Sequence, residues 1–171
     1  MSENNSQYDV IVIGAGVAGL YQLFKLRQLK LQALVIEAGD NVGGTWYWNR
    51  YPGARFDSES WSYGYSFSKE LYEEWDWPEH FAAQPDTLRY LNYVADKFDL
   101  RRDIKFDRRV EASVFDQENN LWTVRTNTEE EYVARFLITA LGPLSAFTLP
   151  NIEGRETFKG PAYHTARWPH E

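Results

Sequence analysis

Two short apolar runs with a helical pattern between them stand near the start of the chain. Residues 8–13 form an apolar, β-branched run of the kind found in buried parallel strands. From Leu20 to Lys30 the apolar positions recur at the helical period, and residues 33–36 form a second apolar run that ends in the acid Glu37. The pattern therefore predicts a strand–helix–strand unit over residues 8–37.

The second half of the chain alternates between helical and strand patterns. Residues 71–74 predict a short helix, and residues 84–99 a longer one with Pro85 near its start. Three strands separated by polar hairpin turns follow, at residues 105–117, 121–126 and 132–140. We expect the last strand to return to the parallel sheet over residues 136–140, so that the hairpins form a β-meander inserted into an α/β fold.

The turn between the first predicted strand and helix carries the spacing G-x-G-x-x-G at Gly14, Gly16 and Gly19. In a Rossmann-like unit the first glycine permits a tight turn, the second lets the backbone approach a pyrophosphate, and the third lets the helix pack closely on the sheet. Glu37 stands where a carboxylate accepts hydrogen bonds from an adenosine ribose and repels a 2′-phosphate. The motif therefore predicts binding of FAD or NAD rather than NADP, and its strand and helix context disfavours an ordinary glycine turn.

An aromatic segment follows the second strand. Gly43 and Gly44 predict a turn where the backbone approaches a cofactor closely, with a plain loop as the alternative. Residues 49–60 show neither helical nor strand period, yet so much aromatic area argues against disorder. We interpret the segment as an ordered loop beside a flat aromatic ligand such as an isoalloxazine ring, or as aromatic core plus an interface. Five of the seven tryptophans lie here: Trp46, Trp48, Trp61, Trp75 and Trp77.

Composition excludes several classes of protein. A chain of 171 residues, 43% hydrophobic and 25% charged, has room for one domain with a sizeable core. The net charge of −7 argues against a nucleic-acid partner, and no apolar run approaches a membrane span. The absence of cysteine excludes disulfides, zinc-thiolate sites and a cysteinyl-flavin link, and we expect a bound FAD to be non-covalent. We see no secretory signal, so the cytoplasm is the default compartment. Residues 1–7 are polar, and we expect them to form a flexible tail.

Three further stretches carry a family resemblance: GGTWYWNRYPGARFD at residues 43–57, ARFLITALG at 134–142 and FKGPAYHTARWP at 158–169. The last fits the signature F-x-G-x-x-x-H-T-x-x-W-P. From residue 8 to the end, the sequence resembles flavin-dependent Baeyer–Villiger monooxygenases of the cyclohexanone and phenylacetone monooxygenase type. The signature residues are Phe158, Gly160, His164, Thr165, Trp168 and Pro169.

The resemblance implies roles for individual residues. Asp57 is the implied catalytic residue, orienting an arginine that stabilises a flavin-peroxide anion, although it could be a turn residue. His164 resembles a residue that couples domain movement, although it could be a hydrogen-bonded linker histidine. Arg55, Phe56 and Asp57 lie where such enzymes bring the nicotinamide of NADPH near the flavin. The implied contacts to FAD are Gly14, Gly16, Gly19, Glu37, Gly44, Thr45, Trp46, Tyr47, Trp48, Asp57, Tyr63 and Val110.

The implied reaction is the conversion of a ketone to an ester or lactone by NADPH and O₂ through a C4a-peroxyflavin. The expected organisation is a Rossmann-like FAD-binding domain over residues 8–150 and a linker with the signature over residues 151–171. No second G-x-G-x-x-G for NADPH is present. We therefore expect the fold to be incomplete relative to the family, and catalysis to require the remaining C-terminal portion in cis or in trans. The alternative function is a non-catalytic FAD-binding or protein-interaction module.

Overall fold

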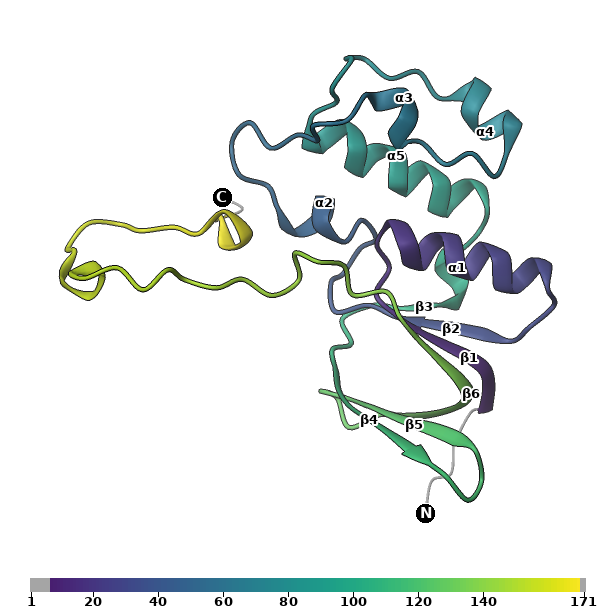
Figure 1. Cartoon of the computed structure of the whole chain (residues 1–171). Helices are drawn as coiled ribbons and strands as arrows, with labels where there is room; N and C mark the ends of the chain where they lie inside the picture. The colour runs from purple at the N-terminus through teal and green to yellow at the C-terminus, as the bar shows by residue number, and fades with distance from the viewer. Residues whose placement is uncertain (1–6, 170–171) are drawn as a thin grey trace.

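A six-stranded mixed sheet forms the centre of the fold (Figure 1). The computed structural model describes residues 7–169, so residues 1–6 of the predicted tail lie outside the described residues, whereas Gln7 already belongs to the first strand. The strand order is β3-β2-β1-β6-β5-β4. The strands are β1 (Gln7–Ile13), β2 (Ala33–Ile36), β3 (Ile104–Lys105), β4 (Val110–Asp116), β5 (Leu121–Thr126) and β6 (Glu131–Thr139).

Strand β1 lies in the middle of the sheet and pairs in parallel with both β2 and β6. Val10 and Val12 face one core cluster, whereas Ile11 between them faces the other. Strand β6 joins the hairpins to the parallel sheet, because residues 131–134 pair antiparallel with β5 and residues 133–139 pair parallel with β1. The predicted return of this strand to the parallel sheet is therefore confirmed.

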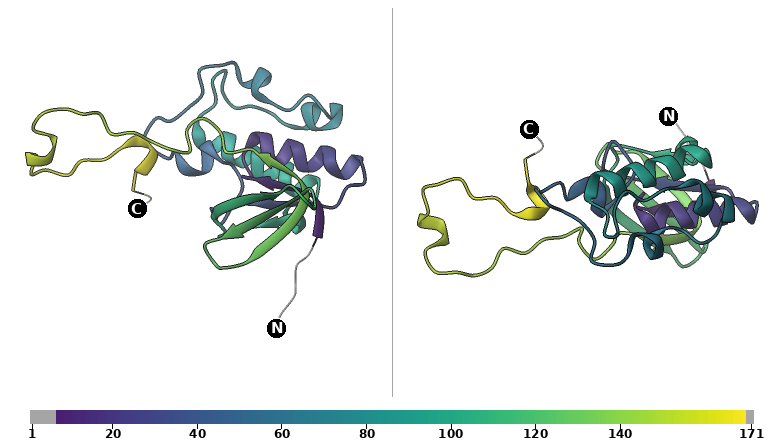
Figure 2. Two further views of the ribbon diagram at one scale, coloured as in Figure 1. Left: turned by 60° about the horizontal axis from the view of Figure 1, so that its bottom comes forward. Right: turned by 90° about the horizontal axis from the view of Figure 1, so that it is seen from above.

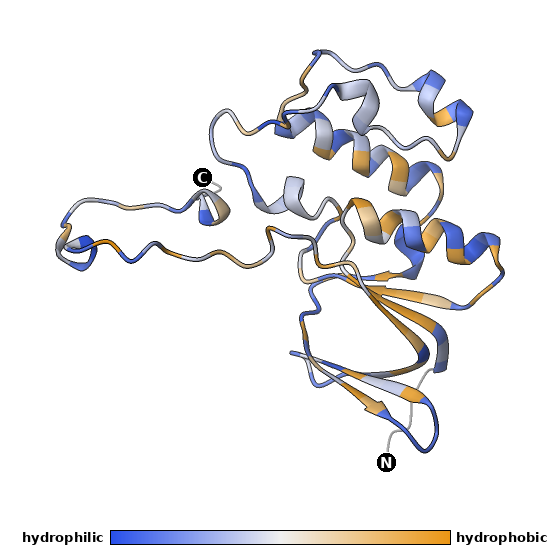
Figure 3. Ribbon diagram, viewed as in Figure 1, coloured by the Kyte–Doolittle hydropathy of each residue, from blue (hydrophilic) through white to orange (hydrophobic). Residues whose placement is uncertain are grey.

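Helices cover one face of the sheet, and the β4–β5 hairpin folds toward the other (Figure 1). Leu20 and Leu23 of one helix are buried against β1 and β2, whose strands stand out as hydrophobic in Figure 3. Among residues 7–169, no helix has the length and apolar character needed to cross a membrane. The helices are α1 (Val17–Gln28), α2 (Thr45–Trp48), α3 (Ser60–Tyr63), α4 (Lys69–Glu74) and α5 (Gln84–Lys97).

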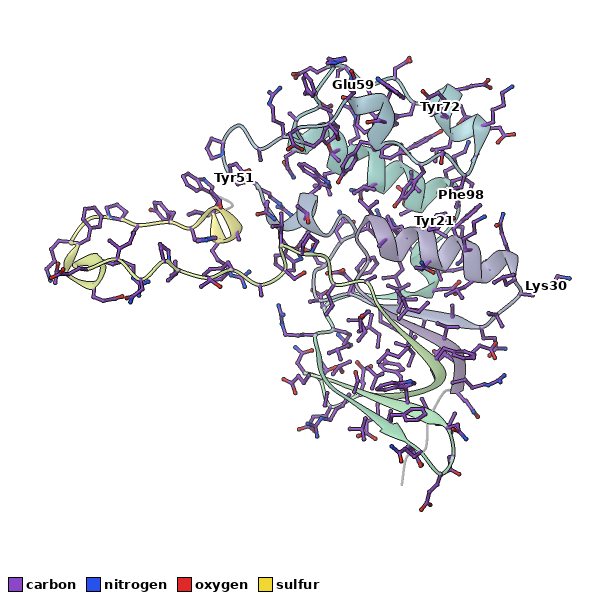
Figure 4. All side chains as sticks on the ribbon, viewed as in Figure 1. Tyr21, Lys30, Tyr51, Glu59, Tyr72 and Phe98 are labelled. Carbon is purple, nitrogen blue, oxygen red and sulfur yellow. The ribbon has the colours of Figure 1, made fainter. Side chains whose placement is uncertain are left out.

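Several details differ from the sequence prediction, including the end of α5, which lies at Lys97 rather than at Asp99. The first helix ends at Gln28 rather than Lys30, because Lys30 has a φ of 60° in the turn to β2, where Figure 4 shows it beyond the helix end. The predicted strand 105–117 is two strands, because Asp107 has a φ of 55° and turns the chain. One part, β3, extends the parallel sheet, and the other, β4, begins the meander. The short helices α2 and α3 were not predicted.

Residues 141–169, which we call the arm, extend away from the sheet in all three views of Figures 1 and 2. The arm contains two 3₁₀ helices, η2 (Arg155–Thr157) and η3 (Thr165–Arg167). Its two limbs meet where the rings of Phe147 and His164 lie 4.6 Å apart, with the Arg167 guanidinium 5.0 Å from the Phe147 ring. The arm therefore has internal contacts of its own while most of its side chains stay exposed.

The Glu130 carboxylate in the hairpin between β5 and β6 should make the free energy of unfolding depend on pH in the acid range. The hydroxyl of Thr128 donates to the Glu130 carboxylate at 2.7 Å and Arg108 pairs with it, and these bonds lower the pKa of Glu130. A carboxyl group with a depressed folded-state pKa adds stability above its unfolded pKa of about 4.3 and loses it as pH falls through the folded value. Denaturant unfolding should therefore show Glu130→Gln less stable than wild type at neutral pH and equal to it in acid.

The exposed Glu131 on β6 serves as the matched control for this titration. Glu131→Gln should track wild type across the whole pH range. A Glu130→Gln difference that persists unchanged at the lowest pH would show that the carboxylate bonds are not its cause.

Candidate functional site

Glycines at the corner between β1 and α1 let neighbouring backbone segments approach one another very closely. Gly14 has a φ of +102°, and its N–H donates to the Ile36 carbonyl at 2.8 Å. A Cβ on Gly14 would lie 2.7 Å from the Ala140 carbonyl oxygen, and a Cβ on Gly19 only 1.8 Å from the Gly14 carbonyl oxygen. Real Cβ atoms do not approach backbone this closely, so the corner requires glycine at both positions.

A second glycine loop meets this corner. The N–H of Gly43 donates to the Ala15 carbonyl at 3.0 Å. A Cβ on Gly44, whose φ is +53°, would lie 2.8 Å from the Cα of Gly16. Residues 14–19 and 43–44 therefore meet backbone against backbone at their glycines, and we call the place where they meet the glycine crease.

The N-terminal end of α1 opens into the glycine crease. Its N-cap, Gly16, provides no side-chain cap, and the first turn contains no acidic residue. The first backbone N–H groups of a helix have no partners within the helix, and together with the helix dipole they favour an anion. The crease is thus suited to a pyrophosphate, both in the space that glycine leaves and in its electrostatics.

Glu37 reaches the same crease from the end of β2. Its side chain is 4% exposed, and Oε2 accepts from the Ala15 N–H at 2.6 Å while Oε1 accepts from the Gly39 N–H at 2.8 Å. The carboxylate therefore links the β1–α1 turn to the segment that follows β2. It points into the crease, as its predicted role requires, and the contact to a ribose stays a prediction.

The segment between β2 and α2 is held in place by Arg101, which lies in the 3₁₀ turn Arg101–Asp103 after α5. Arg101 Nη1 donates to Asn41 Oδ1 at 2.9 Å, and Arg101 Nε donates to Asp96 Oδ1 at 2.5 Å. Asn41 Oδ1 also accepts from the Val42 N–H at 2.8 Å. Sequence reasoning missed Arg101, because its partner Asn41 lies far away along the chain and no local pattern joins them.

Beyond the crease, α2 begins an aromatic wall. Trp46 is buried, and its indole N–H donates to the Tyr63 hydroxyl at 2.7 Å. Tyr63 stacks on Phe56 at 4.4 Å, and its burial raises the pKa of the phenol. The Gln84 carboxamide donates to the Trp46 carbonyl and fixes α2 on α5. The predicted residues Trp46, Phe56 and Tyr63 therefore form one cluster, which Gln84 supports without having been predicted.

Comparison with known proteins places this site in a family. The family model for pyridine nucleotide-disulphide oxidoreductases matches residues 11–171. The chain belongs to this family. Among its relatives, a 2-oxo-Δ³-4,5,5-trimethylcyclopentenylacetyl-CoA monooxygenase of Pseudomonas putida is 51% identical over 94% of this chain and 30% of the relative. The acetone monooxygenase (methyl acetate-forming) of Gordonia sp. strain TY-5 is 49% identical over 95% of this chain and 31% of the relative.

The solved structures agree with this assignment. The OTEMO complex with FAD and NADP is 51% identical and superimposes with a TM-score of 0.88 over 95% of this chain and 31% of that structure. The resemblance to Baeyer–Villiger monooxygenases is thereby confirmed. This member of the oxidoreductase family spans about a third of the length of the proteins that it matches.

The remaining predicted residues of this oxidoreductase family member lie around the wall or outside it. Arg55 donates to Glu79 at 2.9 Å rather than to the exposed Asp57. Tyr47 donates to Asp40 at 2.7 Å with its ring against Gly39, and Val110 packs on the sheet where β4 begins. Thr45 and Trp48 are half-buried at the two ends of α2. The signature residues Phe158, Gly160, His164, Thr165, Trp168 and Pro169 all lie on the arm.

Proposed function

We propose that this chain forms the FAD-binding part of an NADPH- and O₂-dependent monooxygenase that converts ketones to esters or lactones. The observation that carries the proposal is the glycine crease, where an uncapped helix N-terminus, two glycine loops and a carboxylate meet. Its relatives include a methyl acetate-forming acetone monooxygenase, and a solved relative holds FAD and NADP. Bound FAD supplies the redox chemistry that reaction with O₂ requires.

Each element of the site has a task in this proposal. The amides at the start of α1 bind the pyrophosphate, and Gly16 and Gly44 let it approach the backbone. Glu37 binds the ribose hydroxyls, and its bonds to Ala15 and Gly39 hold the carboxylate in place beforehand. Thr45, Trp46, Tyr47 and Trp48 exclude water from the isoalloxazine ring. The absence of cysteine excludes a cysteinyl-flavin link, and in this proposal the flavin is held by non-covalent contacts.

Asp57 and Arg55 complete the proposal on the nicotinamide side. Asp57 is exposed and Arg55 pairs with Glu79, so the Asp57 carboxylate is placed to orient a cation from another segment. His164, which accepts from the Ala166 N–H at 3.1 Å, is a residue of the arm that we assign to coupling between domains. Residues 151–171 act as the linker in this assignment, and residues 8–150 as the FAD-binding domain.

Titration with two flavins tests the cofactor assignment. Tryptophan fluorescence and flavin absorbance should show that FAD binds about tenfold or more tightly than FMN, because only FAD carries the second phosphate and the adenosine that the crease and Glu37 contact. Glu111→Ala, on the exposed side of β4, is a control that should leave both affinities unchanged. Equal affinity for FAD and FMN would exclude the glycine crease as the binding site.

A chimaera tests the catalytic assignment. The chain would replace the matching part of the Gordonia acetone monooxygenase, and oxygen uptake and methyl acetate formation would be measured with NADPH and acetone. We expect ester formation that depends on both. A chimaera that folds and binds FAD but forms no ester would favour the alternative, a non-catalytic FAD-binding or interaction module.

A further inference from the structure

A succession of tryptophan and tyrosine rings leads from α2 to the surface of α5. It begins at Trp46, which contacts Tyr63 and Phe56, and continues through Trp77 and Trp75. It ends at Tyr93 of α5, which is half-buried. We call Trp46, Trp77, Trp75 and Tyr93 the aromatic chain. Tryptophan and tyrosine are among the side chains most easily oxidised by one electron. The aromatic chain is therefore a row of side chains that can each donate an electron.

Trp77, Trp75 and Tyr93 are close enough for direct electron exchange, whereas Phe56 lies between Trp46 and Trp77. The ring centroids of Trp77 and Trp75 are 5.8 Å apart, and those of Trp75 and Tyr93 are 5.4 Å apart. Phe56 bridges the first step, with its ring 5.6 Å from Trp46 and 5.9 Å from Trp77. These spacings are those of ordinary aromatic packing, so packing alone would also produce them. The proton partners at the end of the chain distinguish the two explanations.

Among the residues that the structure describes, none accepts the indole N–H proton of Trp75. Its indole nitrogen is buried and finds no hydrogen-bond partner among the residues that the structure describes. An oxidised indole becomes neutral only by losing this N–H proton, because the nitrogen is a donor and not an acceptor. The Arg89 guanidinium also lies 5.4 Å from the Trp75 ring and repels a positive charge there. A radical cation formed on Trp75 therefore keeps its positive charge and is unfavourable. It is removed when a neighbouring ring transfers an electron to Trp75.

Tyr93 has the opposite environment. Its hydroxyl donates to Glu74 Oε2 at 2.6 Å, and Lys97 Nζ binds the same oxygen at 2.5 Å. The Lys97 ammonium lies 5.9 Å from the Tyr93 ring and opposes a positive charge on it. Transfer of the phenolic proton to Glu74 removes this charge. Tyr93 is thus the member of the aromatic chain with a carboxylate base in hydrogen-bond contact.

We propose that the aromatic chain carries one-electron oxidising equivalents from the α2 region to Tyr93, with Glu74 as the proton acceptor. A radical oxidant takes one electron from an indole of the aromatic chain, is itself reduced to an anion, and leaves an indole radical cation. In each step an electron passes from the next ring toward the radical cation. In the last step Tyr93 gives one electron to the Trp75 radical cation and its proton to Glu74, which yields intact Trp75, a neutral tyrosyl radical and a neutral carboxylic acid.

A second succession of rings leads elsewhere and serves as the comparison. From Trp77 it runs through Tyr90 and Tyr65 to the exposed Tyr21, with Tyr90 and Tyr65 5.9 Å apart and Tyr65 and Tyr21 6.5 Å apart. The Tyr65 hydroxyl donates to the Val17 carbonyl at 2.6 Å, and a carbonyl is not a base. Figure 4 labels Tyr21 on α1 and Tyr72 on α4. Both labelled tyrosines are suitable controls.

The biological role of the aromatic chain rests on the proposed FAD-dependent function. The electron transfer along it does not depend on bound FAD. If FAD and O₂ react beside α2, stray oxidising equivalents formed there would be led to the surface, where soluble reductants can repair the tyrosyl radical. The transfer itself is testable on the protein without flavin, so failure of the route and failure of the FAD assignment are separate results.

Pulse radiolysis with the azide radical tests the transfer. This one-electron oxidant takes an electron from tryptophan and becomes azide anion. We expect indole radical absorption to decay while phenoxyl absorption grows, at a rate independent of protein concentration, as transfer within one molecule requires. Tyr93→Phe keeps the ring and its packing and should lose most of the phenoxyl signal. Tyr21→Phe and Tyr72→Phe should retain it.

Glu74→Gln tests the proton acceptor and separates it from packing. With Tyr93 present and its carboxylate partner removed, phenoxyl growth should slow several-fold and become dependent on the concentration of added buffer base. Circular dichroism would check that each variant keeps its fold. An unchanged phenoxyl yield in Tyr93→Phe, or an unchanged rate in Glu74→Gln, would overturn the proposal.

Discussion

Replacing Gly19 with alanine should destabilise the protein by about 3 kcal/mol and weaken FAD binding at the same time, since overpacking a close contact typically costs 1–3 kcal/mol. The new Cβ would lie 1.8 Å from the Gly14 carbonyl oxygen, which cannot move without displacing the β1–α1 corner. The change therefore separates α1 from the sheet where the crease is formed. Denaturant unfolding and FAD titration of the same sample measure the two effects.

Gly64→Ala is the matched control for this substitution. Gly64 has a φ of −66°, and the nearest atom to a Cβ there is 3.6 Å away, so alanine fits without strain. Its effect on stability should stay within about 1 kcal/mol, with FAD binding unchanged. If Gly19→Ala proves as harmless as Gly64→Ala, α1 does not pack on the corner as closely as described.

Replacing Glu37 with alanine should cost about 1–3 kcal/mol for each of the two amides that it leaves without an acceptor. The amides of Ala15 and Gly39 both donate to this carboxylate at a site that is 4% exposed. Glutamine keeps the shape but turns an NH₂ group toward one of them, so it should fall between alanine and wild type. Unfolding curves measure this order.

The affinity for FAD is a second measurement that tests the role of Glu37. Because glutamine cannot accept from both ribose hydroxyls, FAD should dissociate about tenfold or more readily from Glu37→Gln than from wild type, while the weaker affinity for FMN should hardly change. Loss of stability with unchanged FAD affinity would make Glu37 a structural link between the loops and exclude its contact with the ribose.

The first strand–helix–strand unit could be predicted because its determinants are local. The apolar run before Gly14 and the helical period after Gly19 identify β1 and α1, and the glycine spacing identifies the corner between them. The acid at Glu37 then completes the motif. The same reasoning found the two hairpins, where Asn120 and Glu129 adopt positive φ values of 56° and 62°.

The rest depends on contacts between distant parts of the chain. The predicted strand 105–117 divides at Asp107, whose N–H donates to the Gly39 carbonyl, and no strand pattern reports a bond to that loop. Arg101 and Gln84 support the site through partners about forty to sixty positions away. Helices α2 and α3 are single turns held by aromatic packing, too short for periodicity to detect.

The dual pairing of β6 has a consequence for how the polypeptide acquires its shape during synthesis. One edge of β1 can find its neighbour only after residues 133–139 have left the ribosome, long after the glycine motif has emerged. Pairing across so large a sequence separation is slow. Because Ala140 lies against Gly14 just after that same strand, a nascent chain is unable to assemble the β1–α1 corner early, and capture of the FAD that we propose to bind there should come late in maturation.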